Sequence, residues 1–342
     1  MFSIEGGIKL TPKINEYDYL HINARIHAIE GKMLTRDRIE RMLEARSAEE
    51  AAKVLAECGY EDFGALTPMS IERSLGKARL GIFEELRKSA PDPRLVDVFC
   101  IKYDYHNAKT LLKAEAMGTE PDALFIDAGR YRVASLRDDY VKEDFRHESE
   151  TFRKAVVDAK ETLAATGDPQ KADFVLDRAY YAEMLEEAKA TGSAFLMGYV
   201  RLSIDAANLR AAVRASRMGQ DLGFVKQVLV PGGDVPVDAV AEAAVGNGDL
   251  AARYSRTPLE GAAAVGARLL SGGALTEFER LCDNAVTAYL AGARRVAFGE
   301  MPIIGYLYAR EAELTTIRII LTGKLAGLDN ETIRERLRDT YA

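Results

Sequence analysis

Two aspartates in this sequence have a type and spacing that could suit metal chemistry. Asp138 and Asp139, with Glu143 four residues after the second, could begin an acidic cluster of the DDxxD kind, in which carboxylates hold divalent ions. That pattern needs an acid at position 142, where the chain has Lys142. One acidic pair at helical spacing is common on exposed helix faces, so we interpret these residues as a solvated surface.

Histidines are the other candidate metal ligands, and their spacing is unfavourable. The chain has four, at positions 21, 27, 106 and 147, and none of them forms HExxH or an i, i+4 pair. The chain also lacks GxxxxGK[ST], and Gly246-Asn247-Gly248 lacks the third glycine of a dinucleotide fingerprint. We therefore predict no catalytic, cofactor-binding or metal-binding residues, and we interpret the glycine pair as a turn.

One stretch of the chain occurs three times, and its recurring residues pack helices rather than move protons. The shared pattern is an acid, then Asn or Thr at +3, a base at +5 and aliphatic residues at +7 and +8. The signature residues are Asp104, Asn107 and Lys109, then Asp205, Asn208 and Arg210, and finally Glu313, Thr316 and Arg318. The three starts are separated by 205 − 104 = 101 and 313 − 205 = 108 residues. Such a period predicts three versions of one unit. His106 is not shared by the other copies, which favours a packing or surface role.

The signature predicts a helix with an acid on its apolar face. At about 100° per residue, positions 0, +3, +4, +7 and +8 share one stripe, whereas the base at +5 can reach solvent. A buried carboxylate needs a partner. About thirty residues upstream each unit carries an acid-arginine pair. One hypothesis pairs Arg73, Arg178 and Arg280 with Asp104, Asp205 and Glu313; the alternative leaves these arginines solvated on the surface.

The rest of the chain predicts an all-α protein, because no segment alternates with the period of several strands. A long helix is expected over 95–116, another over 143–165, and a capping box at Thr276 and Glu279 opens a further helix. Gly129 and Gly233 align after the first two signatures, which extends the similarity beyond one helix. We predict an N-terminal arm at 1–16 and helical repeats at 17–118, 119–219 and 220–342, which together form one structural unit.

The composition indicates which kinds of partner and compartment suit this chain. The 342 residues are 48% hydrophobic and 29% charged with a net charge of −7, which argues against broad nucleic-acid binding. No run of 18 apolar residues predicts a membrane span, and the N-terminus does not read as a signal peptide. Three cysteines without CxxC fit reduced thiols in the cytosol. Arg294 and Arg295 could contact an acidic partner, or simply end a helix in solvent.

The chain resembles a known family over nearly its whole length. The most specific stretch is C-terminal: Pro302 to Leu307, Glu311 to Glu313, Arg318 to Lys324 and Arg334 to Leu337. The family's Asp-x-x-Asn-x-Lys/Arg element is met at Asp104–Lys109 and Asp205–Arg210, and Thr316 departs from it in the third copy. On these residues the chain resembles the C subunit of archaeal and bacterial V/A-type ATPases and ATP synthases, the counterpart of the d subunit of eukaryotic vacuolar ATPases.

The resemblance implies three similar helical bundles around a pseudo-threefold axis, forming a funnel. It implies a non-catalytic protein on the cytoplasmic face of the membrane, seated on the proteolipid ring, with a cavity that receives the central-shaft subunits. Its role would be to couple shaft rotation to proton or sodium transport and to ATP synthesis. Two other readings stay open: a helical adaptor of another complex, and a soluble all-α enzyme whose metal is held by Asp104, Asp205 and Glu313 on a common axis.

Overall fold

The computed structural model describes residues 14–119 and 121–341, and within these ranges it contains helices and no strand. The all-α prediction is confirmed. The predicted arm at 1–16 lies outside the described residues except for positions 14–16. Six helices form the frame: α4 (Pro68–Ser89), α5 (Arg94–Met117), α8 (Pro169–Thr191), α9 (Ala194–Arg217), α14 (Thr276–Leu290) and α15 (Met301–Leu325).

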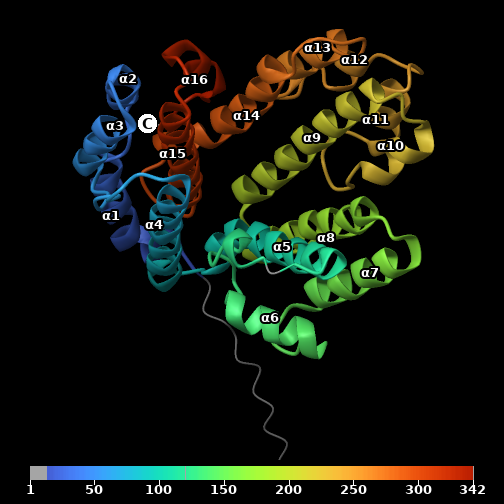
Figure 1. Ribbon diagram of the computed structural model, residues 1–342, viewed down its shortest axis with the longest axis horizontal. Coiled ribbons are helices and arrows are strands. Elements are labelled where there is room, and N and C mark those ends of the chain that lie inside the picture. Colours follow the sequence, from blue (N-terminus) through green and yellow to red (C-terminus); the bar gives the residue numbers. More distant parts are fainter. Residues whose placement is uncertain (1–13, 120, 342) are drawn as a thin grey trace, which may run out of the picture.

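The other helices flank these six (Figure 1). Before α4 come α1 (Leu20–Glu30), α2 (Arg36–Glu44) and α3 (Ala48–Val54), and between α5 and α8 come α6 (Val133–Lys142) and α7 (Glu150–Thr166). Between α9 and α14 lie α10 (Leu222–Val228), α11 (Val237–Ala244), α12 (Leu250–Arg253) and α13 (Glu260–Arg268), and α16 (Asn330–Arg336) follows α15.

The signature stretches lie on α5, α9 and α15, as their periodicity predicts. Position 0 and positions +3, +4, +7 and +8 are buried in all three copies. Local signals explain where these helices begin and end. The Ser193 hydroxyl accepts a hydrogen bond from Leu196 N at the start of α9, Pro302 occupies the first turn of α15, and Gly118 takes a left-handed conformation after α5.

Two local predictions need correction. The helix expected over 143–165 begins at Glu150, because Ser149 caps it and Glu143 ends α6 in a left-handed conformation. The capping box expected at Thr276 and Glu279 does not form. Leu275 is the N-cap and makes no side-chain cap, so Thr276 is already inside α14.

These six frame helices form a closed circuit of contacts. Each of α4, α5, α8, α9 and α14 contacts the next one in chain order, and α15 returns to contact α4. We call this arrangement the six-helix ring. In chain order it consists of three pairs of helices, α4–α5, α8–α9 and α14–α15, which we call hairpins because a short connection joins the two helices or their flanking turns; each pair ends in a signature helix. In Figure 1 the helices gather into three groups, one around α4 and α15, one around α5 and α8, and one around α9 and α14, so each group joins helices of two different hairpins.

The apolar core joins distant parts of the chain. One cluster of buried side chains runs through α5, α8, α9 and α14. A second cluster joins α2, α3 and α4 to the far end of the chain; it includes Ile39, Leu43 and Ile71 with Leu314 and Ile317 of α15. The N-terminal helices therefore pack with α15 in space (Figure 1), although almost the whole chain separates them in sequence. The repeat boundaries at 118 and 219 remain a prediction.

Candidate functional site

The carboxylate of Asp104 holds the loop that follows α5. It accepts hydrogen bonds from the backbone N–H of Arg130 at 2.9 Å and of Tyr131 at 3.2 Å, and the Arg130 side chain pairs with it at 2.7 Å. Asp104 is completely buried, and the Arg130 side chain is 7% exposed. A buried carboxylate that accepts several N–H donors fixes the backbone that supplies them. The acid therefore fastens a loop to its own helix.

Asp205 repeats this arrangement without a cation. Its carboxylate accepts hydrogen bonds from Asp234 N at 2.9 Å and Val235 N at 3.1 Å. No basic side chain pairs with it among the residues that the structure describes. The loop after α9 is thus held in the way that the loop after α5 is held, and backbone N–H groups alone supply the partners.

The amide at +3 forms hydrogen bonds to the same loops, a few residues before the segment that the acid binds. Asn107 donates to Ile126 O at 2.8 Å and accepts from Ile126 N at 3.0 Å. Asn208 makes the same two bonds with Val230, both at 2.8 Å. A primary amide can satisfy one residue's N–H and C=O together, as a neighbouring β-strand would. We call each acid-amide pair with its loop a loop clamp.

Each clamp depends on a glycine. A Cβ at Gly129 would lie 2.1 Å from Asp104 Oδ1, and one at Gly233 would lie 2.0 Å from Asp205 Oδ1. Neither position leaves room for a side chain while the carboxylate stays in place. The alignment of these two glycines is therefore explained by close approach to the carboxylate.

The third copy clamps a loop from the other end of the chain. Glu313 accepts from Leu34 N and from the Tyr60 hydroxyl, both at 2.5 Å, and pairs with Arg310 at 2.7 Å. Thr316, which stands where the other copies have Asn, is buried beside it. The loop after α1 thus occupies the place that the loops after α5 and α9 occupy in their clamps.

The predicted arginine partners are wrong. Arg73 is exposed on α4, Arg178 donates instead to Gln227 O at 3.0 Å, and Arg280 faces a groove beside α14. Asp104 and Asp205 are partnered by the loops that follow their helices, and Glu313 by the loop after α1. Among the described residues, Asp104 and Glu313 also pair with an arginine, Arg130 and Arg310. The alternative interpretation, surface arginines, is closer to the structure.

The signature bases connect one hairpin of the six-helix ring to the next. Lys109 on α5 pairs with Asp177 on α8 at 2.6 Å, and Arg210 on α9 pairs with Asp283 on α14. Arg318 on α15 pairs with Glu72 on α4 at 2.5 Å, which closes the circuit.

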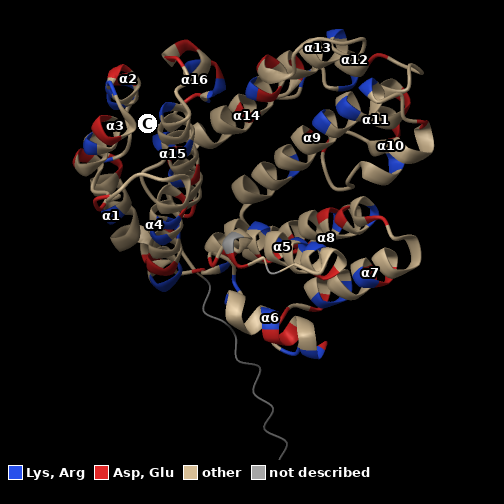
Figure 2. Ribbon diagram, viewed as in Figure 1, with Lys and Arg blue, Asp and Glu red and all other residues tan. Residues whose placement is uncertain are grey.

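A second ion pair lies one helical turn further along each of the first two helix contacts, α5 with α8 and α9 with α14. Lys113 pairs with Asp173 at 2.7 Å, and Arg214 pairs with Glu279 at 2.5 Å. Figure 2 shows basic and acidic positions interspersed along these helices. Sequence reasoning identified the bases at +5 but not their role, because each partner belongs to another unit.

A buried charge cluster was also missed. Glu311 on α15 pairs with Arg79 of α4 at 2.9 Å and with Lys102 of α5 at 2.5 Å, and the Tyr103 hydroxyl donates to the same carboxylate. Burial raises the pKa of Glu311, but Lys102 and Arg79 outweigh it and lower the pKa to about 2. The only sequence signal was an acid two residues before Glu313, and it does not recur in the other copies.

At the two loop clamps, burial has the largest effect on the pKa of the aspartate. It raises the pKa of Asp104 to about 6 despite Arg130, and it raises the pKa of Asp205 to about 6 despite the bonds from Val235 and Asp234. An acid whose folded pKa exceeds its unfolded value stabilises the fold below the unfolded pKa. That contribution is lost as pH rises through the folded value.

We expect Asp205→Asn to change the pH dependence of stability. As pH rises from about 4 to about 6, the wild type should lose stability relative to the variant, by at most ~1.4 kcal/mol per pH unit. Urea unfolding of both proteins at pH 4.5 and pH 7 measures this difference. The contributions of carboxylates that both proteins contain cancel when their free energies of unfolding are subtracted. A difference that is the same at both pH values would contradict the assignment.

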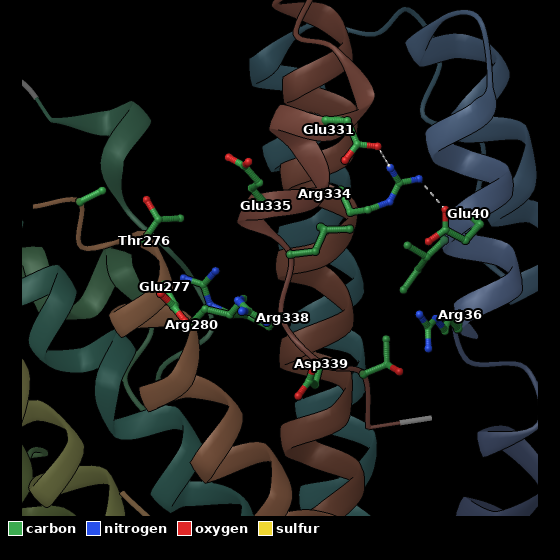
Figure 3. Close-up of a pocket in the computed structure, with 14 residues that line it drawn as sticks. Arg36, Glu40, Thr276, Glu277, Arg280, Glu331, Arg334, Glu335, Arg338 and Asp339 are labelled. Atoms are coloured by element: carbon green, nitrogen blue, oxygen red, sulfur yellow. Dashed lines mark hydrogen bonds and ion pairs between the residues drawn. The ribbon is translucent and has the colours of Figure 1, made fainter. Parts of the chain in front are cut away.

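Two recesses lie near the junction of the hairpins. A groove of about 870 Å³ is lined by α2, α14, α16 and the segment after α16, and Figure 3 shows Arg280 and Arg338 beside one another in it. A smaller cavity of about 260 Å³ lies where α5, α8, α9, α14 and α15 meet, and Arg338 lines it as well. The pair proposed for partner contact is elsewhere: Arg294 donates to Tyr341 O at 2.9 Å, and Arg295 is exposed.

Side chains that could bind metal do not converge. Within residues 14–119 and 121–341 no three His, Cys, Asp or Glu residues group as a metal site, and Asp104, Asp205 and Glu313 each hold a different loop. Lys142 pairs with Asp138 at 2.5 Å on an exposed face, and His106 contacts Leu124 O at 2.9 Å. Among the described helices, none combines the length and apolarity that crossing a bilayer requires.

Comparison with known proteins gives one consistent result. The model of the ATP synthase (C/AC39) subunit family matches residues 22–336. The C subunit of a V-type sodium ATPase from Enterococcus hirae is 24% identical, over 95% of this chain and 99% of its own length. The C subunits of A-type ATP synthases from a Desulfurococcus species and from Methanocaldococcus jannaschii are 25% and 24% identical, each over 93% of this chain and over 90% and 86% of their own lengths.

Proposed function

We propose that this chain is the socket of the central stalk of a rotary ATPase. The proposal starts from its family: the chain belongs to the ATP synthase (C/AC39) subunit family and is thus a non-catalytic subunit of a V/A-type ATPase. Its work is to transmit torque between the central-shaft subunits and the proteolipid ring. Ion transport and ATP synthesis belong to the complex as a whole.

The observation that carries this proposal is the six-helix ring. A torque coupler has to resist twisting, and a closed circuit resists it better than an open array because every helix is held on both sides. The ion pairs from Lys109, Arg210 and Arg318 join each hairpin to the next, including the last to the first. The repeated contacts support three similar units around a pseudo-threefold axis.

The proposed partners are the shaft on one side and the proteolipid ring on the other. In this arrangement the protein lies on the cytoplasmic face of the membrane, and the recesses near the junction of the hairpins open toward the shaft. The loop clamps keep the connections between helices in place, so that load on one hairpin passes to its neighbours instead of deforming a loop.

The test is co-elution with the purified central-shaft subunits of the same ATPase on gel filtration, with a run that lacks this chain as control. We expect a stable complex with the shaft, and separately with the detergent-solubilised proteolipid ring. If folded shaft and folded chain elute apart and the proteolipid ring is not bound either, the socket proposal is wrong. Binding to a different complex would then favour the helical adaptor.

A further inference from the structure

The cavity at the junction of the hairpins is bordered by two charged clusters that each have more cations than anions. Glu311 is shared by Arg79 and Lys102, and Asp283 is shared by Arg210 and Arg338. Counted over the ion pairs of the described residues, each cluster therefore carries about one net positive charge. Removing charge from water is costly unless an opposite charge compensates it, so this site favours an anion.

The basic groups are placed to meet such an anion. The Lys102 side chain is 40% exposed, whereas the Arg79 side chain is 6% exposed, so Lys102 is the more accessible cation of the first cluster. Arg338 lines both the cavity and the larger groove, and Arg280 lies next to it in Figure 3. Arg280 has no ion-pair partner among the described residues. Arg280 and Arg338 therefore place two guanidinium groups where the groove meets the cavity, whereas the groove as a whole is lined by acidic and basic side chains in similar number.

The walls of the cavity suit a short side chain. Phe99 stacks on Tyr199 with ring centroids 5.3 Å apart, and Tyr308 meets Tyr199 edge to face at 6.2 Å. These rings hold one another in place, so the site is formed before a ligand arrives. The half-buried Tyr180 also lines the cavity, and its hydroxyl has no hydrogen-bond partner in the described part of the chain.

We propose that this cavity binds a carboxylate at the tip of a partner chain, which Lys102, Arg338 and Tyr180 would receive. Resting on the proposed function, the inference assigns the carboxylate to an acidic residue at the lower end of the central shaft. A volume of about 260 Å³ admits a side chain and its immediate backbone but not a whole helix. The shaft would therefore be anchored by one inserted residue, and the surrounding groove would contact the rest of its tip.

The test uses the full chain with ¹³C-labelled methionine methyl groups, because Met184 lines the cavity whereas Met42 lies in the other apolar cluster. The first probe is N-acetylglutamate, and its uncharged control is N-acetylglutamine. We expect the acid to shift the Met184 resonance with a dissociation constant of about millimolar, as suits so small a ligand. Met42 should not move, and the amide should have no effect.

Three variants locate the binding groups. Lys102→Gln and Tyr180→Phe should each weaken N-acetylglutamate binding by about tenfold, because each removes a donor to a charged group. Lys102→Gln leaves the Arg79 and Glu311 pair intact, and Tyr180→Phe keeps the ring. Tyr181→Phe is the matched control: Tyr181 is the next residue on α8 but lines a different recess, so binding should be unchanged. Equal shifts by acid and amide, or no shift at about 50 mM, would overturn the carboxylate site.

Adding the shaft separates this inference from the proposed function. We expect the shaft to perturb Met184 and to bind Lys102→Gln about tenfold more weakly than wild type. A shaft that co-elutes but leaves Met184 unchanged would overturn the anchor and leave the socket standing. A shaft that does not bind, with N-acetylglutamate still shifting Met184, would count against the socket and support the carboxylate site.

Discussion

Replacing Glu311 by Gln should destabilise the protein by about 3–5 kcal/mol, because it leaves buried cations without their anion. Arg79 is the main reason: its side chain is 6% exposed and its carboxylate partner is Glu311. Lys102 reaches solvent and contributes less. Urea unfolding at pH 7, followed by far-UV circular dichroism, measures the loss. A change below about 1 kcal/mol would show that Arg79 is satisfied in another way.

The matched control is an exposed ion pair on the same helices. Glu72 and Arg318 also join α4 to α15, but their side chains are 51% and 32% exposed. Glu72→Gln should therefore cost at most about 1 kcal/mol. The two variants remove the same charge from the same interface, so their difference isolates the effect of burial.

The pH dependence of Glu311→Gln supplies a second check. A carboxyl whose folded pKa is lowered stabilises the fold above its unfolded value, and this stabilisation is lost as pH falls through the folded value. For Glu311 those values are 4.5 and about 2. The difference between wild type and variant should therefore be constant from pH 5 to pH 7 and shrink only in stronger acid.

Placing a side chain at Gly233 should be almost as damaging. A Cβ there would lie 2.0 Å from Oδ1 and 2.7 Å from Cγ of Asp205, so Gly233→Val forces the carboxylate or the loop out of the clamp. The strain and the lost hydrogen bonds to Asp234 and Val235 together predict a loss of about 3–4 kcal/mol. Thermal and urea unfolding measure it.

A glycine in open space serves as the control for Gly233. Gly261 lies in α13, and a Cβ there would meet no atom within 4 Å. Gly261→Ala should stabilise the protein by about 0.5–1 kcal/mol through helix propensity. The mechanism has its own test: in the Asp205→Ala background, Gly233→Val should cost clearly less than in wild type. Fully additive losses would place the damage of Gly233→Val outside the clamp.

Helices and their buried faces could be predicted from the sequence, because both depend on local spacing. The stripe of Asp205, Asn208 and Val213 is buried as its periodicity indicates. The hydrogen-bond partners could not be predicted in the same way. Asp205 meets backbone N–H groups, which every residue except proline carries, so no residue type marks them.

Partners from other units escaped prediction for a further reason. The three acid-arginine pairs drew attention to the arginines, whereas in two of them the acid, Glu72 or Asp177, holds a signature base of another unit. Glu311 is separated from Lys102 and Arg79 by 209 and 232 residues. Hydrophobic periodicity predicts which face of a helix is buried, but it does not predict which distant helix packs against that face.

The closure of the six-helix ring through α15 and α4 has a consequence for how the chain is made. Glu72 and Arg318 are 246 residues apart, and the apolar faces of α2, α3 and α4 are covered by α15. At about 5–20 residues per second, a ribosome needs roughly 10–50 s to supply α15 after α4 has emerged. During that interval the nascent N-terminal helices display uncovered hydrophobic surface. We therefore expect this segment to depend on chaperones during translation, and the finished protein to acquire resistance to proteolysis only when its last long helix arrives.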